Sequence, residues 1–253
     1  MAKPGEIVAI IPARYGSSRL PGKPLIDLCG RPMIQHVYER AKKAKLVGRV
    51  IVAADDERVV EAVRAFHGEV VMTPPDVRSG SDRAAIVARS IPDASIVVNV
   101  QGDEPLIEPA MIDEAVQPLA EDRTLLVGTL VRRIDTSEEL VNPNIVKVVL
   151  DAQGFAMYFS RSPIPHNRDD QSPGIRYKHI GLYVFQREFL LKFASLPEMA
   201  LERAEKLEQL RVLEHGYRIK ATVTKYDSIP VDTREDAERV RALLLRKTLK
   251  VSS

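Results

Sequence analysis

Tryptophan is absent from the 253-residue sequence, cysteine occurs once, and aromatic residues make up only 5% of the chain. The single cysteine, Cys29, cannot form an internal disulfide and has no partners suited to a redox or metal site. Few aromatic side chains and a net charge of +2 argue against a nucleic-acid-binding surface. No apolar run approaches the roughly 20 residues that span a bilayer. We therefore expect a cytoplasmic protein with neither a nucleic-acid nor a membrane partner.

Several catalytic signatures are missing as well. The chain contains neither the G-x-G-x-x-G pattern of dinucleotide-binding proteins nor a Walker A sequence. It also lacks a G-x-S-x-G nucleophile elbow and a pair of histidines four residues apart. These absences argue against serine hydrolases and helical zinc sites. Asp55 after the second expected strand suggests an NAD-binding oxidoreductase, but the missing glycine pattern makes this alternative weak.

The first half of the chain alternates between strand and helix patterns. We expect strands over 6–11, 49–54, 69–72, 95–101 and 125–132, and helices over 32–44, 57–66, 81–90 and 110–119. Strands that alternate with helices form right-handed βαβ units, so this half predicts a mostly parallel sheet covered on both faces.

The second half has a different pattern. Runs over 145–150 and 155–160 flank Gly154 and predict a hairpin, and another strand is expected over 179–185. A helix over 202–214, a strand over 219–224 and a capped helix over 234–249 follow. We expect one α/β domain over 1–253, with a Rossmann-like, mostly parallel sheet and an inserted antiparallel lobe at about 133–186.

A basic loop follows the first expected strand and runs from Arg14 to Lys23. Ligands of open α/β sheets bind beyond the carboxyl ends of the strands, where this loop is placed. The loop supplies three cations, two hydroxyl groups and two glycines that permit close backbone approach: Arg14, Arg19, Lys23, Ser17, Ser18, Gly16 and Gly22. This composition suits a triphosphate, although a solvated basic loop is the alternative.

Two acidic residues are candidate ligands for Mg²⁺. Asp103 follows the most hydrophobic strand, and Asp232 precedes the last helix. Mg²⁺ usually binds through one or two carboxylates together with substrate phosphates. A turn-forming Asp at 103 and a helix N-cap at 232 are the structural alternatives.

Further polar residues have side chains of the kind used in ligand recognition. The segment Ser79–Arg83 opens a helix and offers donors to a nucleobase or sugar, or it simply caps the helix. Recognition-type side chains in the second half are Arg161, His179, Tyr183, Glu208 and Gln209, and taken alone each of them favours a structural role over a functional one.

Taken together, the segments resemble the 3-deoxy-manno-octulosonate (KDO) cytidylyltransferases, also called CMP-KDO synthetases. The resemblance extends from near residue 6 to near 245, and the later segments are more specific than the first. The matching segments are 11–25, 79–83, 98–105, 142–147, 158–165, 179–183, 207–211 and 231–236. Two small departures occur: Ser81 stands where the family usually has Thr, and Ala54 stands where Thr is common.

The resemblance implies a fold of the nucleotide-diphospho-sugar transferase type and transfer of CMP from CTP to KDO for lipopolysaccharide biosynthesis, with Mg²⁺ as cofactor and a homodimer as the assembly. It implies catalytic roles for Arg14, Arg19, Lys23 and Asp103, and metal binding by Asp103 and Asp232. The implied nucleotide-binding residues are Ala13, Arg14, Gly16, Ser17, Lys23, Pro74, Ser79, Gly80, Asp82 and Gln101. The implied sugar-binding residues are Gln101, Arg161, His179, Tyr183, Glu208 and Gln209.

Two alternatives stay open at this point. One is a cytidylyltransferase for a related sugar acid, such as an 8-amino sugar acid or a sialic acid, because a single side chain can distinguish an amino group from a hydroxyl. The other is a non-catalytic nucleotide-binding protein that kept the fold.

Overall fold

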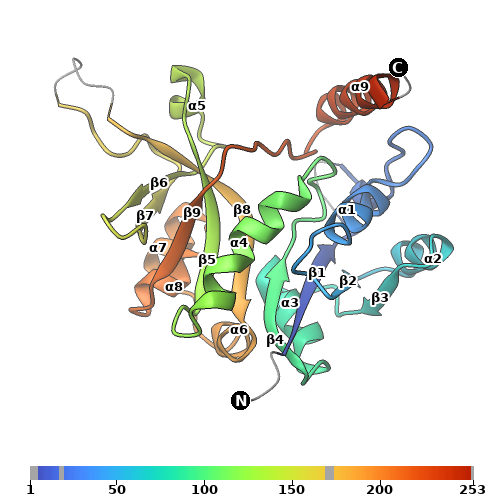
Figure 1. The fold of residues 1–253 in the computed structure, drawn as a ribbon, viewed down its shortest axis with the longest axis horizontal. Coiled ribbons are helices and arrows are strands. Elements are labelled where there is room, and N and C mark those ends of the chain that lie inside the picture. Colours follow the sequence, from blue (N-terminus) through green and yellow to red (C-terminus); the bar gives the residue numbers. More distant parts are fainter. Residues whose placement is uncertain (1–4, 17–19, 169–173, 252–253) are drawn as a thin grey trace.

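The computed structural model describes residues 5–16, 20–168 and 174–251, which form a mixed α/β fold (Figure 1). Its strands are β1 Glu6–Ala13, β2 Arg49–Ala54, β3 Glu69–Met72, β4 Ala94–Asn99, β5 Val127–Arg133, β6 Lys147–Leu150, β7 Ala156–Ser160, β8 Tyr177–Gln186 and β9 Ile219–Val223. Its helices are α1 Met33–Ala41, α2 Glu57–Ala65, α3 Gly80–Arg89, α4 Pro109–Glu121, α5 Ser137–Val141, α6 Arg187–Phe193, α7 Ala200–Glu205, α8 Leu210–Glu214 and α9 Arg234–Val251, with a 3₁₀ turn, η1, at Lys23–Leu25.

The strands form a mostly parallel sheet with the order β3-β2-β1-β4-β8-β5-β9, which confirms the expected fold class. Strand β8 is antiparallel to both of its neighbours, β4 and β5, whereas β5 and β9 are parallel. Every strand on this path except β8 therefore runs in one direction. The strand expected over 179–185 belongs to this main sheet, while β6 and β7 pair beside it. The single domain and the boundaries of the lobe remain predictions.

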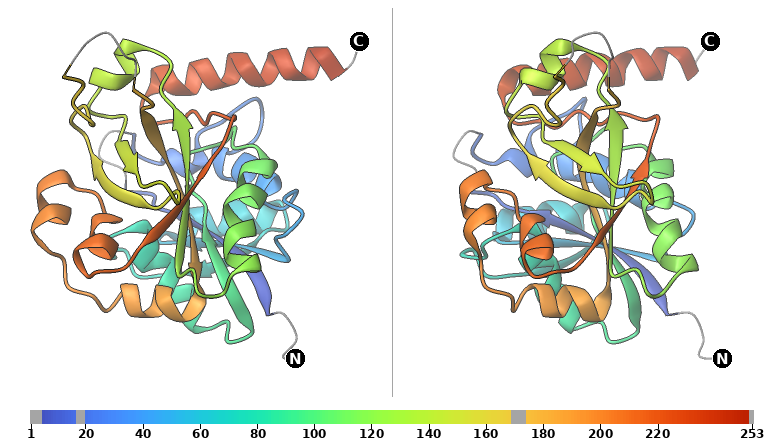
Figure 2. Two further views of the ribbon diagram at one scale, coloured as in Figure 1. Left: turned by 60° about the vertical axis from the view of Figure 1, so that its left-hand side comes forward. Right: turned by 90° about the vertical axis from the view of Figure 1, so that its left-hand side faces the viewer.

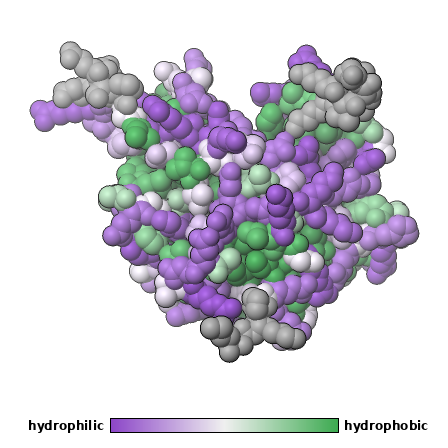
Figure 3. All heavy atoms as spheres, in the orientation of Figure 1, coloured by the Kyte–Doolittle hydropathy of each residue, from purple (hydrophilic) through white to green (hydrophobic). Residues whose placement is uncertain are grey.

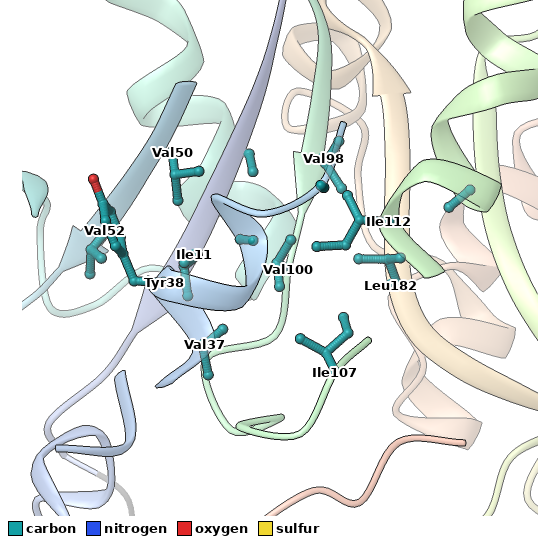
Figure 4. Packing of buried hydrophobic residues seen from close by; sticks show 14 of the residues in the cluster. Ile11, Val37, Tyr38, Val50, Val52, Val98, Val100, Ile107, Ile112 and Leu182 are labelled. Atoms are coloured by element: carbon teal, nitrogen blue, oxygen red, sulfur yellow. The ribbon is translucent and has the colours of Figure 1, made fainter. Parts of the chain in front are cut away.

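The hydrophobic core lies on both faces of the sheet. On β1, Ala9 and Ile11 face a layer that includes α1, α2 and α4, while Val8 and Ile10 face α3, α6 and α8. Figure 4 shows the first layer, where Ile11 and Val98 of the sheet lie near side chains of α1 and α4. Burial of each large aliphatic side chain contributes about 1.5–3 kcal/mol, so these two layers hold the strand ends in place.

A third, smaller cluster fixes the last helix. Val231, Ala237 and Val240 pack against Leu28 and Met33 near the start of the chain. Figure 2 shows α9 lying across the top of the molecule and extending beyond the rest of the fold. The segment before α9 is thereby held beside the loop that follows β1.

The prediction of one continuous helix over 202–214 is wrong, because the structure has two short helices there, α7 and α8. Lys206 ends α7 with a left-handed backbone, at a φ of 55°. Leu207 is buried in the core beside the break. The sequence pattern did not reveal the interruption, since Lys and Glu are good helix formers and no Gly or Pro marks it.

The fold brings the predicted site to one edge of the sheet. The carboxyl ends of β1 and β4 lie there, and so does the amino end of β8, because β8 runs in the opposite direction. Gly102, after β4, passes so close to β1 that a Cβ atom would lie 2.5 Å from the carbonyl oxygen of Pro12. Only glycine fits there, and the close passage places Asp103 beside the loop that follows β1. In the described part of the chain, none of the helices is long and apolar enough to span a membrane.

Candidate active site

The basic loop and the two acidic candidates meet at one point. Lys23 Nζ lies 2.6 Å from Asp103 Oδ2 and 2.9 Å from Asp232 Oδ1. Burial alone would lower the pKa of the Lys23 ammonium, but Asp103 and Asp232 outweigh it and raise the pKa above its ordinary value. Lys23 is therefore a fixed cation between two carboxylates, which lie 80 and 209 positions further along the chain.

A cavity of about 520 Å³ surrounds this cluster. Of the residues predicted to bind the nucleotide or the metal, it is lined by Ala13, Arg14, Gly16, Lys23, Gly80, Gln101, Asp103 and Asp232. Ser17 and Arg19 lie outside the described residues. The cavity combines Arg14 and Lys23 with backbone of the loop after β1, and this composition suits a polyphosphate.

The remaining predicted nucleotide residues do not line this cavity in the described part of the chain. Ser79 is the N-cap of α3, with Oγ accepting a hydrogen bond from the Asp82 N–H at 3.1 Å. Asp82 is buried, and its Oδ1 accepts a hydrogen bond from Arg211 Nη1 at 3.2 Å. The carbonyl of Pro74 accepts a hydrogen bond from Arg83 at 2.9 Å. Their contacts in this structure are with protein groups, and their roles toward a nucleotide stay predictions.

A second cavity, of about 870 Å³, adjoins the first. Its lining includes five of the six predicted sugar-binding residues, namely Gln101, His179, Tyr183, Glu208 and Gln209. Gln101 and Asp232 line both cavities, so the two meet at the end of β4. Glu139 of α5 and Arg239 of α9 also line the second cavity, and Figure 3 shows a hollow between these two helices at the top of the molecule.

Arg161 is the predicted sugar-binding residue that is not part of this lining. Its Nε donates to the carbonyl oxygen of Glu205 at 2.9 Å, and its Nη1 donates to that of Pro143 at 3.0 Å. The guanidinium thus holds two backbone segments together. Its role as a partner for a sugar carboxylate stays a prediction.

The interrupted helix accounts for the placement of Glu208 and Gln209. Both residues lie in the connection between α7 and α8, where their side chains reach α3 and β8. Glu208 Oε1 accepts a hydrogen bond from Ser81 Oγ at 2.9 Å. Gln209 Oε1 accepts one from the Tyr183 hydroxyl at 2.9 Å, and the buried Nε2 has no hydrogen-bond partner among the described residues. The connection therefore presents an acid and an amide donor to the second cavity.

Burial controls the charge of the groups in the second cavity. It lowers the pKa of His179 to about 3, so this imidazole is neutral at pH 7, and its Nε2 lies 2.8 Å from Thr129 Oγ1. Burial also raises the pKa of Tyr183 well above its ordinary value. For Glu208, burial raises the pKa, although hydrogen bonds from Ser79 and Ser81 counteract part of the shift. His179 and Tyr183 are therefore neutral hydrogen-bonding groups at pH 7, and their role toward a sugar stays a prediction.

Sequence reasoning assigned no role to Glu104, which lines the second cavity and is 6% exposed. Burial and the neighbouring Asp103 raise the pKa of Glu104 to about 7, and Ser228 Oγ donates to its Oε2 at 2.9 Å. In the sequence, its position next to Asp103 was the available sign of a role in the site. Its hydrogen-bond partner Ser228 is 124 positions away, so a local pattern could not reveal that contact.

Comparisons with known proteins identify the family of the chain. A family model described as cytidylyltransferase matches residues 8–220. The 3-deoxy-manno-octulosonate cytidylyltransferase of Geotalea uraniireducens (strain Rf4) is 57% identical over 245 residues, covering 93% of this chain and 97% of the relative. That of Geobacter sulfurreducens (strain ATCC 51573 / DSM 12127 / PCA) is 56% identical over 245 residues, covering 93% and 98%.

Solved structures extend the likeness to three dimensions. CMP:2-keto-3-deoxy-manno-octonic acid synthetase complexed with CTP has a TM-score of 0.91 and 45% identity, with 96% of this chain and 99% of that chain covered. The fold is shared with the 4-diphosphocytidyl-2C-methyl-D-erythritol synthase of Anaerococcus prevotii DSM 20548. That structure has a TM-score of 0.65 and 16% identity, with 96% of this chain and 100% of that chain covered. The chain belongs to the 3-deoxy-manno-octulosonate cytidylyltransferase family.

Proposed function

We propose that the chain transfers the cytidylyl group of CTP to 3-deoxy-D-manno-octulosonate, giving CMP-KDO and pyrophosphate for lipopolysaccharide biosynthesis. The observation that carries this proposal is the junction of two cavities at Gln101 and Asp232, beside Lys23 and Asp103. A group-transfer site needs two substrates whose reacting atoms meet, and the two cavities supply adjoining places for them.

In the proposed reaction, the anomeric hydroxyl oxygen of the sugar bonds to the α-phosphorus of CTP. The bond from that phosphorus to the oxygen leading to the β-phosphate breaks, pyrophosphate leaves with the bonding electrons, and the hydroxyl proton passes to solvent. No protein nucleophile is required, because positioning and charge stabilisation account for most of the catalysis of phosphoryl-type transfer. Arg14 and Lys23 supply fixed positive charge on the nucleotide side.

Mg²⁺ is the cofactor in this proposal, and Asp103 and Asp232 would hold it. Their oxygens converge on one Lys23 Nζ, from 2.6 and 2.9 Å, and thus form a small cluster of hard oxygen ligands. Among the described residues, no group of three or more His, Cys, Asp or Glu side chains could hold a metal. The pair matches Mg²⁺, which typically combines one or two carboxylates with substrate phosphates. The ion would neutralise phosphate charge.

A homodimer in the cytoplasm completes the proposal. Val141, Met157 and Ile175 are 61–64% exposed, and all three belong to the segment between β5 and β8. Exposed apolar side chains in one region are typical of a protein contact. A single cysteine, which cannot form an internal disulfide, suits the reducing cytoplasm.

The decisive experiment measures pyrophosphate release from CTP with Mg²⁺ and a panel of eight- and nine-carbon sugar acids. We expect release with KDO, and much less with a sialic acid or an 8-amino analogue. Release with a different sugar acid, and none with KDO, would mean that the proposed substrate is wrong. CTP binding without turnover of any acid would identify a nucleotide-binding protein without catalytic activity. An absence of both binding and turnover in a folded sample would refute the proposal.

A further inference from the structure

A buried ion pair lies beneath the nucleotide side of the site, at the carboxyl ends of the first three parallel strands. Asp55 follows β2, and its side chain is 7% exposed. Arg83 belongs to α3, and its side chain is fully buried. Arg83 Nη2 lies 3.6 Å from Asp55 Oδ2. Neither residue lines the two cavities in the described part of the chain.

Asp55 holds the beginning of the loop after β1. Its Oδ1 accepts a hydrogen bond from the backbone N–H of Tyr15 at 2.8 Å. Its Oδ2 also lies 4.0 Å from Nε of Arg14, whose half-exposed side chain lines the first cavity. One carboxylate thus fixes the backbone of this loop and faces its first cation.

Arg83 holds the segment after β3. Its Nη1 donates to the carbonyl oxygen of Pro74 at 2.9 Å, and its Nη2 contacts that of Pro75 at 3.4 Å. Burial lowers the pKa of Arg83, and the charge of Asp55 acts in the opposite direction. A buried guanidinium needs a compensating charge, and Asp55 is the nearby carboxylate that pairs with it.

The pair therefore connects two segments that are otherwise far apart in sequence. The loop at 14–16 is tied to Asp55, Asp55 is paired with Arg83, and Arg83 is tied to the carbonyls at 74 and 75. The first segment faces the proposed triphosphate side. The second contains Pro74, which the family resemblance places against the nucleotide.

We propose that Asp55 is a positioning residue for the nucleotide, which sets the loop after β1 relative to the segment after β3. This inference rests on the proposed function, since it concerns how CTP is held. Asp55 acts through Tyr15, Arg14 and Arg83, so it should affect the affinity for CTP and leave the affinity for the sugar acid unchanged.

Asp55→Asn is the principal test, because Asn retains the size of the side chain and an acceptor for the Tyr15 N–H but removes the charge. We expect the KM for CTP to rise about tenfold or more, with the KM for the sugar acid within about twofold of the wild type. Equilibrium binding of CTP without sugar acid should weaken by the same factor. A purely structural role would instead lower the active fraction and the apparent kcat, with both KM values unchanged.

Asp122→Asn is the matched control, because Asp122 is exposed at the end of α4 and lines neither cavity in the described part of the chain. Asp122 accepts a hydrogen bond from the Thr124 N–H at 2.8 Å, and Asn can accept the same bond. This variant should keep the wild-type KM for CTP. If Asp55→Asn does not fold, Asp55→Glu keeps the charge but moves the carboxylate, and should raise the KM for CTP about threefold or more.

The outcomes separate this inference from the proposed function. A wild-type protein that does not bind CTP would overturn both. Wild-type CTP binding with an unchanged KM for CTP in folded Asp55→Asn, or in Asp55→Glu where only that variant folds, would overturn the role of Asp55 alone. Failure of both variants to fold would reduce the pair to a stabilising contact and would also overturn this role.

Discussion

Lys23 illustrates at the scale of one residue how a charge becomes part of a site. An isolated lysine on a loop is solvated and mobile, but here two carboxylates fix its Nζ at 2.6 and 2.9 Å. The side chain is 15% exposed, so the charge faces the cavity with little shielding by water. A cation held in place before substrates bind needs little reorganisation during transfer.

Lys23→Ala should therefore lower kcat by about an order of magnitude or more, because it removes positive charge where phosphate charge develops. Pyrophosphate release at saturating CTP and KDO measures the effect. Lys42→Ala is the matched control, since Lys42 is exposed at the end of α1 and should leave kcat unchanged. Wild-type turnover in Lys23→Ala would exclude Lys23 from the mechanism.

His179 makes a residue-scale prediction about pH. Burial lowers its pKa from 6.5 to about 3, so the folded state prefers the neutral ring. Its contribution to stability is present above pH 6.5 and is lost as the pH falls from 6.5 toward 3. When the pH falls from 7.5 to 5, protonation of His179 in the unfolded state should lower the free energy of unfolding by about 2 kcal/mol.

His179→Gln removes the titration while keeping a polar group near Thr129. Urea unfolding at pH 7.5 and pH 5 should show a smaller loss of stability in this variant than in the wild type. His166 is exposed, and His166→Gln should retain the wild-type loss. An identical loss in His179→Gln and the wild type would mean that another group controls acid destabilisation.

At the scale of elements, the connection between α7 and α8 links the two sides of the site. Ser81, in the first turn of α3, is fully buried and accepts a hydrogen bond from Asn99 Nδ2 at 3.0 Å. It donates to Glu208, which lines the second cavity. Helix α3, on the proposed nucleotide side, thus orients Glu208 on the proposed sugar side.

Ser81→Ala should raise the KM for the sugar acid by about threefold to tenfold, because Glu208 loses a buried hydrogen bond. CTP binding should stay near the wild-type value, and Ser81→Thr, which keeps the hydroxyl, should restore the KM. Ser90→Ala, near the other end of α3, is the control. Equal KM values in Ser81→Ala and the wild type would show that Glu208 is held without Ser81.

Element patterns explain what the sequence could predict. Strands β2 and β3 lie at their expected bounds, because each is a short apolar run followed by a polar stretch. The convergence of Lys23 and Asp103 was also foreseeable, since both follow strands of a parallel sheet. The position of β8 between β4 and β5 depends on contacts between distant segments, which a local pattern does not contain. The break at Lys206 was not predictable because the local sequence consists of good helix formers.

At the scale of the whole molecule, the three most exposed large apolar side chains of the described residues lie in the segment between β5 and β8. Met157 of β7 is 63% exposed. If this region is the contact of a homodimer, Met157→Asp should shift the molar mass measured by light scattering from two chains toward one. Leu245 of α9 is 56% exposed, and Leu245→Asp should leave the mass unchanged. A wild-type protein with the mass of one chain would contradict the proposed dimer.

The contact between Lys23 and Asp232 joins residues 209 positions apart. During synthesis the chain emerges from its amino terminus, at about 5–20 residues per second. Strands β1 to β4 can pair while the segment that carries Asp232 has not yet been made. The nascent protein therefore passes through a stage in which its sheet is partly built and its acidic pair is incomplete. Catalytic competence should arise only after Asp232 has been synthesised and has reached Lys23.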